Sequence, residues 1–149
     1  MTGELWLEDI HVGHRFRTDV YGLTADDIIE FATKWDPQPF HLSDETAQDT
    51  FFHGLAASGW HTAAITMRLL VTSGIPLAGG IIGGGGELAW PTATRPGDRL
   101  HVEGEVVDVH TSKASPNRGL VTIAYDTLNH DGEVRQSSKV RVLAFAKPH

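Results

Sequence analysis

The sequence of 149 residues contains no cysteine and no long hydrophobic run. Without cysteine the fold cannot use disulfide bonds or thiolate ligands. This composition is typical of a reducing compartment, so we expect the protein in the cytoplasm. No apolar stretch approaches the roughly 18 residues needed to cross a bilayer, and the start, "MTGELWLEDI", lacks the basic and apolar segments of a signal peptide. The sequence therefore predicts a protein that is neither exported nor bound to a membrane.

Positive charge is also scarce, with 12 lysines and arginines against 19 acidic residues and a formal charge of -7. Nucleic acid is an unfavourable partner for such a chain, because phosphates attract clustered lysine and arginine. Hydrophobic residues make up 40% and charged residues 21%, which is close to an ordinary globular protein. We expect one compact domain over residues 1–149.

Three familiar signatures of chemical sites are missing. The nine histidines include no H-E-x-x-H pattern, so we expect no metal. There is no G-x-S-x-G nucleophile elbow for serine hydrolysis. The stretch "AGGIIGGGGELAW" lacks the Walker lysine and the G-x-G-x-x-G spacing of phosphate-binding loops, and it favours unusual backbone angles or close approach to a ligand instead.

Three β-branched, roughly alternating stretches predict long antiparallel strands in the second half of the chain. They are "RLHVEGEVVDVH", "GLVTIAYDTLN" and "EVRQSSKVRVLAFA". A tight link at residues 129–132 joins the last two, and "TSKASPNRG" is predicted to be a longer exposed loop between the first two. "ELAW" before Pro91 is a candidate for a further strand.

Helices are predicted in the first half. "LTADDIIEFATKWDP" has apolar residues at helical spacing and a capping box at Thr24 and Asp27, and Pro37 ends the helix at Asp36. Ser43 is a plausible cap for a short helix through "DETAQ". "SGWHTAAITMRLLVTSG", residues 58–74, is apolar on most faces and predicts a buried central helix. The plan is an α+β domain in which a curved antiparallel sheet wraps the central helix.

The segment "WDPQPFH" between the first two helices holds the strongest chemical candidate. Asp36 and His41 are five residues apart, and Pro37 and Pro39 stiffen the backbone between them. A carboxylate and an imidazole can exchange protons with water near neutral pH, which suits hydration of a double bond. The alternative interpretation is structural, with Asp36 capping a turn and His41 filling a polar pocket.

This segment resembles the D-x-N-P-x-H motif of MaoC-like dehydratases and (R)-specific enoyl-CoA hydratases. Asp36, Pro39 and His41 match it. "ASGWHTAAITMRLL" is similar to the start of the family's central helix, and "WPTATRPGDRL" is similar to its Gly-Asp turn before a long strand. Because the three segments occur in the family's order, the resemblance covers most of the chain.

The resemblance implies a hot dog fold and the reversible hydration of a 2-enoyl-CoA to a 3-hydroxyacyl-CoA, a reaction of fatty acid metabolism, with no cofactor. It implies that Asp36 and His41 are catalytic and that the backbone N–H of Gly59 binds the thioester oxygen, as orphan amides at a helix start favour negative charge. It also implies a homodimer or dimer of dimers in which sheets pair edge to edge, with acyl-CoA as the substrate.

Three further residues are candidates for substrate binding: Gln38, Ser58 and Trp60. Gln38 replaces the asparagine of the family motif and is one methylene longer. Ser58 also suits a helix cap, and Trp60 suits either an acyl pocket or the core. Met67 stands where hydratases often place a serine that bonds to the catalytic acid, and a thioether cannot replace that bond.

Two other functions remain open for the same fold. A hot dog thioesterase would use a carboxylate, a water molecule and a helix-start amide to release free CoA. A non-catalytic module would bind acyl-CoA without turnover.

Overall fold

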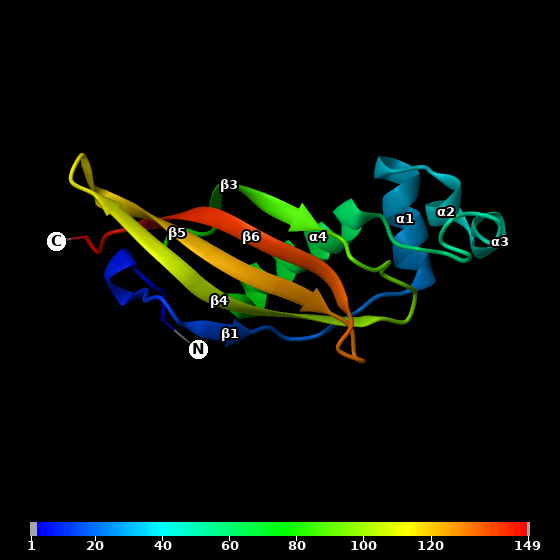
Figure 1. Ribbon diagram of the computed structural model, residues 1–149, viewed down its shortest axis with the longest axis horizontal. Coiled ribbons are helices and arrows are strands. Elements are labelled where there is room, and N and C mark those ends of the chain that lie inside the picture. The colour runs from blue at the N-terminus through cyan, green and yellow to red at the C-terminus, as the bar shows by residue number, and fades with distance from the viewer. Residues whose placement is uncertain (1–2, 149) are drawn as a thin grey trace.

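The protein, seen here as a computed structural model that describes residues 3–148, is built on one antiparallel sheet (Figure 1). The strands lie in the order β1-β4-β5-β6-β3, and β2 pairs with β4 beside β1. Their bounds are β1 Arg15–Arg17, β2 Tyr21–Gly22, β3 Ile82–Ala89, β4 Arg99–Ser112, β5 Ser115–Leu128 and β6 Val134–Phe145. The long strands β4, β5 and β6 confirm the three β-branched predictions, and β3 extends the predicted "ELAW" strand back through the glycines.

The helices fall into two groups. The long α4, Gly59–Leu69, continues into a π-helical turn, η2, Leu70–Gly74, and lies along the sheet. α1 (Ala25–Trp35), which is as long as α4, and the short α2 (Pro39–Leu42) and α3 (Asp44–Ala47) gather at one end of the elongated molecule (Figure 1). A 3₁₀ turn, η1 (Leu7–Asp9), lies at the opposite end near both termini.

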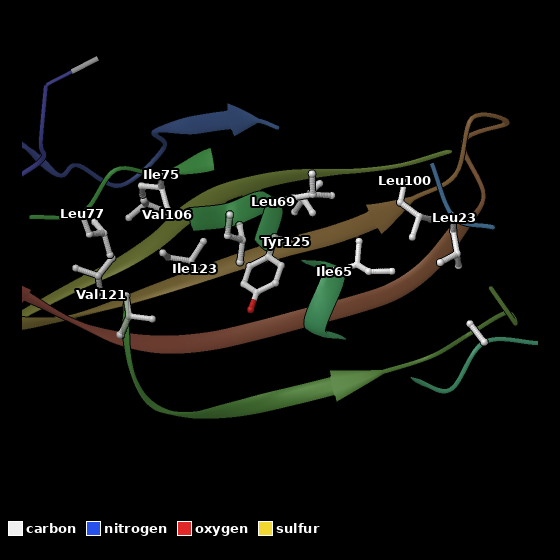
Figure 2. Close-up of a cluster of buried hydrophobic side chains, with 14 of the residues drawn as sticks. Leu23, Ile65, Leu69, Ile75, Leu77, Leu100, Val106, Val121, Ile123 and Tyr125 are labelled. Carbon is white, nitrogen blue, oxygen red and sulfur yellow. The ribbon is translucent and has the colours of Figure 1, made fainter. Parts of the chain in front are cut away.

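The core fills the space between α4 and the sheet (Figure 2). Alternate residues of β5, including Val121 and Ile123, point into it because successive side chains of a strand face opposite sides. Ile65 and Leu69 of α4 meet them from the helix side. A long helix packed on one face of a curved antiparallel sheet is the hot dog fold, so the α+β prediction is confirmed.

The central helix is less buried than its sequence predicts. Ile65 and Leu69 are buried, but the exposed fractions of Trp60, Met67 and Val71 are 62%, 42% and 59%. The exposed side chains repeat at helical spacing along one face, and the sheet of this chain covers only the other. An apolar helix face therefore stays open beside the sheet.

The predicted exposed loop of residues 111–119 is mostly strand. β4 and β5 continue to a turn at residues 113–114, and Ser112 pairs with Ser115. Thr111 pairs with Gly119, so Pro116 and its neighbours have no partner in β4. A bulge of this kind accommodates a proline, which has no N–H for the ladder. The expectation of a long loop was wrong because the bulge places turn-like residues inside the strand.

Within residues 3–148, none of the helices is long and apolar enough to cross a bilayer. The cytoplasmic location stays a prediction.

Candidate active site

Asp36 lies where α1 ends, and the sequence explains both ends of that helix. Asp27 N–H donates to Thr24 Oγ1 at 3.1 Å, and Thr24 N–H donates to Asp27 Oδ2 at 3.2 Å, which confirms the predicted capping box. At the other end Pro37 disfavours a helical backbone at Asp36, which adopts φ -154° and ψ 67°. The N–H of Asp36 still donates to Ala32 O at 2.8 Å, so the acid is held on the last turn.

The chain then curls into α2, as the two prolines predict. Pro39 occupies the first helical position, where its missing N–H costs no hydrogen bond. Gln38 N–H donates to Asp36 O at 2.8 Å, and His41 N–H donates to Gln38 O at 2.9 Å. These bonds bring the side chains of Asp36 and His41 to the same side of the curl.

The two side chains contact each other in a mostly buried position. His41 Nε2 lies 3.3 Å from Asp36 Oδ2, with side-chain exposures of 6% and 18%. His41 Nδ1 lies 2.6 Å from Ala56 O and donates to it, because a carbonyl only accepts. When the ring is neutral, Nε2 presents its lone pair to the carboxylate, and when the ring is charged, Nε2–H donates to it. Two acceptors so close require a hydrogen between or beside them, from an imidazolium or from a water molecule.

The surroundings of Asp36 favour its ionised form. Burial raises the pKa of Asp36, but the nearby Ser58 hydroxyl, the Gln38 amide and the charge of His41 outweigh it, so the pKa lies below its ordinary value. Gln38 Nε2 donates to Asp36 Oδ1 at 2.6 Å. The longer amide that replaces asparagine therefore reaches the acid directly.

Ser58 acts differently from a helix cap. It occupies the N-cap position of α4, but its side chain makes no capping hydrogen bond. Its hydroxyl is fully buried close to the Asp36 carboxylate. Within residues 3–148, no atom lies in the right position to form a complete hydrogen bond with it. A small movement of either side chain would complete a bond between them. Ser58 thus supplies the acid with a hydroxyl from the start of α4, whereas Met67 lies elsewhere.

We expect Ser58→Ala to raise the pKa of Asp36, because the substitution removes one of the groups that lower it. If catalysis needs the carboxylate, the acid limb of kcat/KM moves to higher pH while the rate at high pH changes less. A pH profile of turnover measures this shift. Ser137→Ala, an exposed serine on β6, is the matched control. An unshifted limb for Ser58→Ala would show that Ser58 does not act on the acid.

A cavity of about 370 Å³, here called the catalytic cavity, opens beside His41 and Gln38. Gly59 and Thr62 of α4 line it, together with residues 92–94 and Trp90 from the segment before β4. Phe40, Phe51, Phe52, Ala57 and Arg135 complete the wall. The site is therefore an apolar chamber with a few polar groups, as small-molecule sites generally are.

Gly59 is required for the shape of this cavity. A Cβ built at Gly59 would lie 2.7 Å from Cε2 of Trp90, closer than side chains pack. The absence of a side chain lets the indole rest against the helix start. It also leaves the backbone of Gly59 beside the cavity without a side chain of its own. An amide at the first helical position has no acceptor within the helix, whereas the amides of His61 and Thr62 already donate to Ser58 O.

Arg95 holds the loop that forms the far wall. Its guanidinium donates to the carbonyl oxygens of Phe52 at 2.7 Å, Gly54 at 3.0 Å and Leu55 at 3.3 Å. Ala57 N–H donates to Thr94 O at 2.9 Å. These bonds tie the loop before α4 to the segment before β4, so Phe52 is fixed in the cavity.

The structure brings together five of the six residues singled out in the sequence. Asp36, Gln38, His41 and Ser58 contact one another or lie in adjacent positions, and Gly59 lines the same cavity. The sixth, Trp60, is 62% exposed and packs edge to face on Trp90 with ring centroids 5.1 Å apart, outside the cavity lining. Its role in substrate binding stays a prediction.

Sequence reasoning did not single out Trp90, Phe52 and Arg135. Trp90 begins the quoted "WPTATRPGDRL" segment, but nothing in that pattern indicates that its indole lies over Gly59. Arg135 comes from β6, far along the chain, and reaches the cavity only through strand pairing. Across residues 3–148, no group of three or more histidine and acidic side chains is arranged to hold a metal ion.

The structure thus combines a hot dog domain with an Asp–His pair beside the start of its central helix. The sequence matches the MaoC like domain over residues 10–127, so the chain belongs to the MaoC-like dehydratase family. This membership supports a hydratase or dehydratase activity.

Individual relatives agree with this family. The chain is 32% identical over 126 residues to the uncharacterized protein YdeM of Bacillus subtilis (strain 168), covering 83% of this chain and 86% of that protein. A MaoC-like dehydratase from Rhodospirillum rubrum is 57% identical, with a TM-score of 0.95 and coverage of 97% and 99%. The R-hydratase PhaJ1 from Pseudomonas aeruginosa shares the fold at 23% identity, with a TM-score of 0.75 and coverage of 97% of this chain and 88% of that one.

Proposed function

We propose that the protein catalyses the reversible hydration of a 2-enoyl-CoA to a 3-hydroxyacyl-CoA, with Asp36 and His41 as the acid–base pair. The observation that carries the proposal is the 3.3 Å contact between His41 Nε2 and Asp36 Oδ2 next to a cavity of about 370 Å³. A carboxylate held in its ionised form is suited to accept a proton from water.

A water molecule that donates to both atoms satisfies the two facing acceptors and turns an oxygen lone pair toward the cavity. Its oxygen forms the bond to C3 of the enoyl group as the C2–C3 double bond opens. One member of the pair takes the proton from this water, and the pair returns a proton to C2. Water is thus added without a cofactor, and the reverse sequence is dehydration.

Negative charge develops on the thioester oxygen during this addition, and we assign its stabilisation to the amide of Gly59. Gly59 is the first residue of α4 and lines the same cavity as His41. Helix-start amides favour negative charge, and one oxyanion donor contributes about 3 kcal/mol in other enzymes. The first turn of α4 thus provides the second half of the site.

The direct test is to incubate the purified protein with enoyl-CoA and 3-hydroxyacyl-CoA thioesters. Absorbance of the conjugated thioester reports hydration, and a thiol reagent reports CoA release. Loss of conjugation without free thiol is the expected result. Release of thiol would instead indicate a thioesterase, and binding without either signal would indicate a non-catalytic acyl-CoA-binding module.

The proposed assembly is a homodimer formed through the β3 edge of the sheet. Among the strands of residues 3–148, β3 pairs only with β6, and all eight of its residues are exposed. A long edge with free N–H and C=O groups and apolar side chains such as Leu88 invites pairing with a second strand. The exposed α4 face, with Trp60, Met67 and Val71, provides further apolar surface to cover.

Sedimentation at several protein concentrations tests this assembly. We expect a species of twice the 16.2 kDa chain mass, or four times that mass for a dimer of dimers. Ile82→Asp places a charge on the exposed start of β3 and is expected to shift the equilibrium toward the monomer. A monomeric parent protein at all concentrations would contradict the proposal.

A further inference from the structure

A second hollow lies next to the catalytic cavity. This hollow, here called the helix–sheet pocket, has a volume of about 240 Å³. Its lining consists of Ala63, Thr66, Met67, Gly86, Leu88, Tyr125, Gln136 and Val140. It shares no lining residue with the catalytic cavity, yet the two sets are neighbours in sequence: Thr62 beside Ala63 on α4, and Arg135 beside Gln136 on β6. The groove between α4 and the sheet is therefore divided in two.

One hydrogen-bonded pair stands at the division. Trp90 lines the catalytic cavity, Gln136 lines the helix–sheet pocket, and Trp90 Nε1–H donates to Gln136 Oε1 at 2.9 Å. Gln136 is only 1% exposed, and its amide nitrogen donates to Ser138 Oγ at 3.1 Å. The indole itself rests against Gly59. Both partners are thus held in place, because breaking the bond would leave a buried amide oxygen unpaired.

The chemistry of the helix–sheet pocket suits hydrocarbon. Met67, Leu88 and Val140 supply apolar walls. The Thr66 hydroxyl is already bonded to Thr62 O at 2.8 Å and lies 2.6 Å from Thr127 Oγ1. With the Thr66 hydroxyl bonded within the protein, this pocket offers a largely apolar continuation, which a chain already in the catalytic cavity could enter only if the Trp90–Gln136 pair were removed.

We propose that the Trp90–Gln136 pair is a specificity-determining partition that restricts the enzyme to short-chain acyl thioesters. The inference rests on the proposed function for the identity of the thioester. The position of the Trp90–Gln136 pair between the two cavities does not depend on which reaction is catalysed. A chain in the catalytic cavity must bend away or stop at the indole, so we expect the parent protein to turn over crotonyl-CoA faster than 2-octenoyl-CoA. Trp90 acts on substrate choice rather than on the protons that are transferred.

Trp90→Leu tests the partition because it removes both the ring and the N–H donor. The readout is the ratio of kcat/KM for 2-octenoyl-CoA to that for crotonyl-CoA, which is insensitive to the fraction of active protein. We expect the ratio to rise about tenfold or more, since each added methylene that gains an apolar site contributes severalfold or more to discrimination. Trp90→Phe keeps a smaller wall and serves if the leucine variant does not fold.

Trp60→Leu is the matched comparison, because this neighbouring tryptophan contacts Trp90 but lines neither cavity. A change in the ratio for Trp60→Leu and none for the Trp90 variants would overturn the proposal and assign chain selection to Trp60. Equal turnover of both thioesters by the parent protein would also overturn it.

Binding separates this inference from the proposed function. The affinities of butyryl-CoA and octanoyl-CoA are measured by calorimetry for the parent protein and the Trp90→Leu variant. If no enoyl-CoA is hydrated but Trp90→Leu selectively tightens octanoyl-CoA, the hydratase proposal fails and the partition stands. A second outcome is that hydration occurs but no Trp90 variant changes either the kcat/KM ratio of the two enoyl-CoAs or the affinity ratio of the two acyl-CoAs. In that case the partition fails and the hydratase proposal stands.

Discussion

Asp36→Asn and His41→Ala are each expected to lower kcat/KM for an enoyl-CoA by about a hundred- to ten-thousandfold, the contribution of a positioned acid–base group. Asp36→Asn keeps the shape of the side chain but replaces a proton acceptor by a neutral amide. His41→Ala removes the imidazole whose Nε2 lies 3.3 Å from the carboxylate. Hydration followed by absorbance measures both losses.

The double variant sharpens this result. Because the two groups hold one water molecule, the double variant should lose little more kcat/KM than the worse of the two single variants, as for residues that act as a unit. If the two groups acted independently, the fold-losses of the single variants would multiply. Asp108→Asn and His110→Ala on β4 make the same chemical changes at exposed positions and should retain the parent rate. If Asp36→Asn and His41→Ala stay folded and also retain it, the proposed roles are wrong.

Local signals in the sequence predicted the parts of the fold that local physics determines. The capping box of α1 and the stop at Pro37 gave both ends of that helix, and β-branched alternation located β4, β5 and β6. The curl from Asp36 to His41 was predictable because prolines restrict the backbone and the family motif singles out the same two residues.

Other features depend on contacts between distant segments, which no local pattern encodes. The short strands β1 and β2 exist because β4 offers them an edge, and their two or three residues carry no periodic signal. One face of α4 is exposed because the sheet of a single chain covers only the opposite face of the helix. The partition joins Trp90 to Gln136 across 46 positions of sequence, so only the fold shows that they meet.

Asp98→Ala is expected to destabilise the protein by about 3–5 kcal/mol, the cost of leaving a buried charge without its partner. Asp98 and Arg135 are 4% and 7% exposed, and Arg135 Nε donates to Asp98 Oδ2 at 3.0 Å. Asp98 also accepts from Arg95 N–H at 2.9 Å and from Asn129 Nδ2 at 3.1 Å. One carboxylate thereby joins the segment before β4, the turn before β6 and β6 itself. Chemical unfolding at fixed protein concentration measures the loss, which corresponds to roughly 6–20 °C in Tm for a chain of this size.

The pH dependence of the same loss identifies its electrostatic origin. Burial raises the pKa of Asp98, but the bonds from Arg135, Arg95 and Asn129 and the charge of Arg135 lower it below the ordinary value. Since the folded-state pKa is depressed, the stabilisation is fully present above the unfolded-state pKa and is lost as the pH falls through the folded-state pKa. The parent protein should therefore approach the stability of the variant in acid.

Glu133→Gln is the control, because Glu133 lies 3.8 Å from Arg135 with its side chain 54% exposed. This substitution should lower the free energy of unfolding by less than about 1 kcal/mol. An equal and pH-independent loss in both variants would mean that Asp98 contributes packing rather than charge.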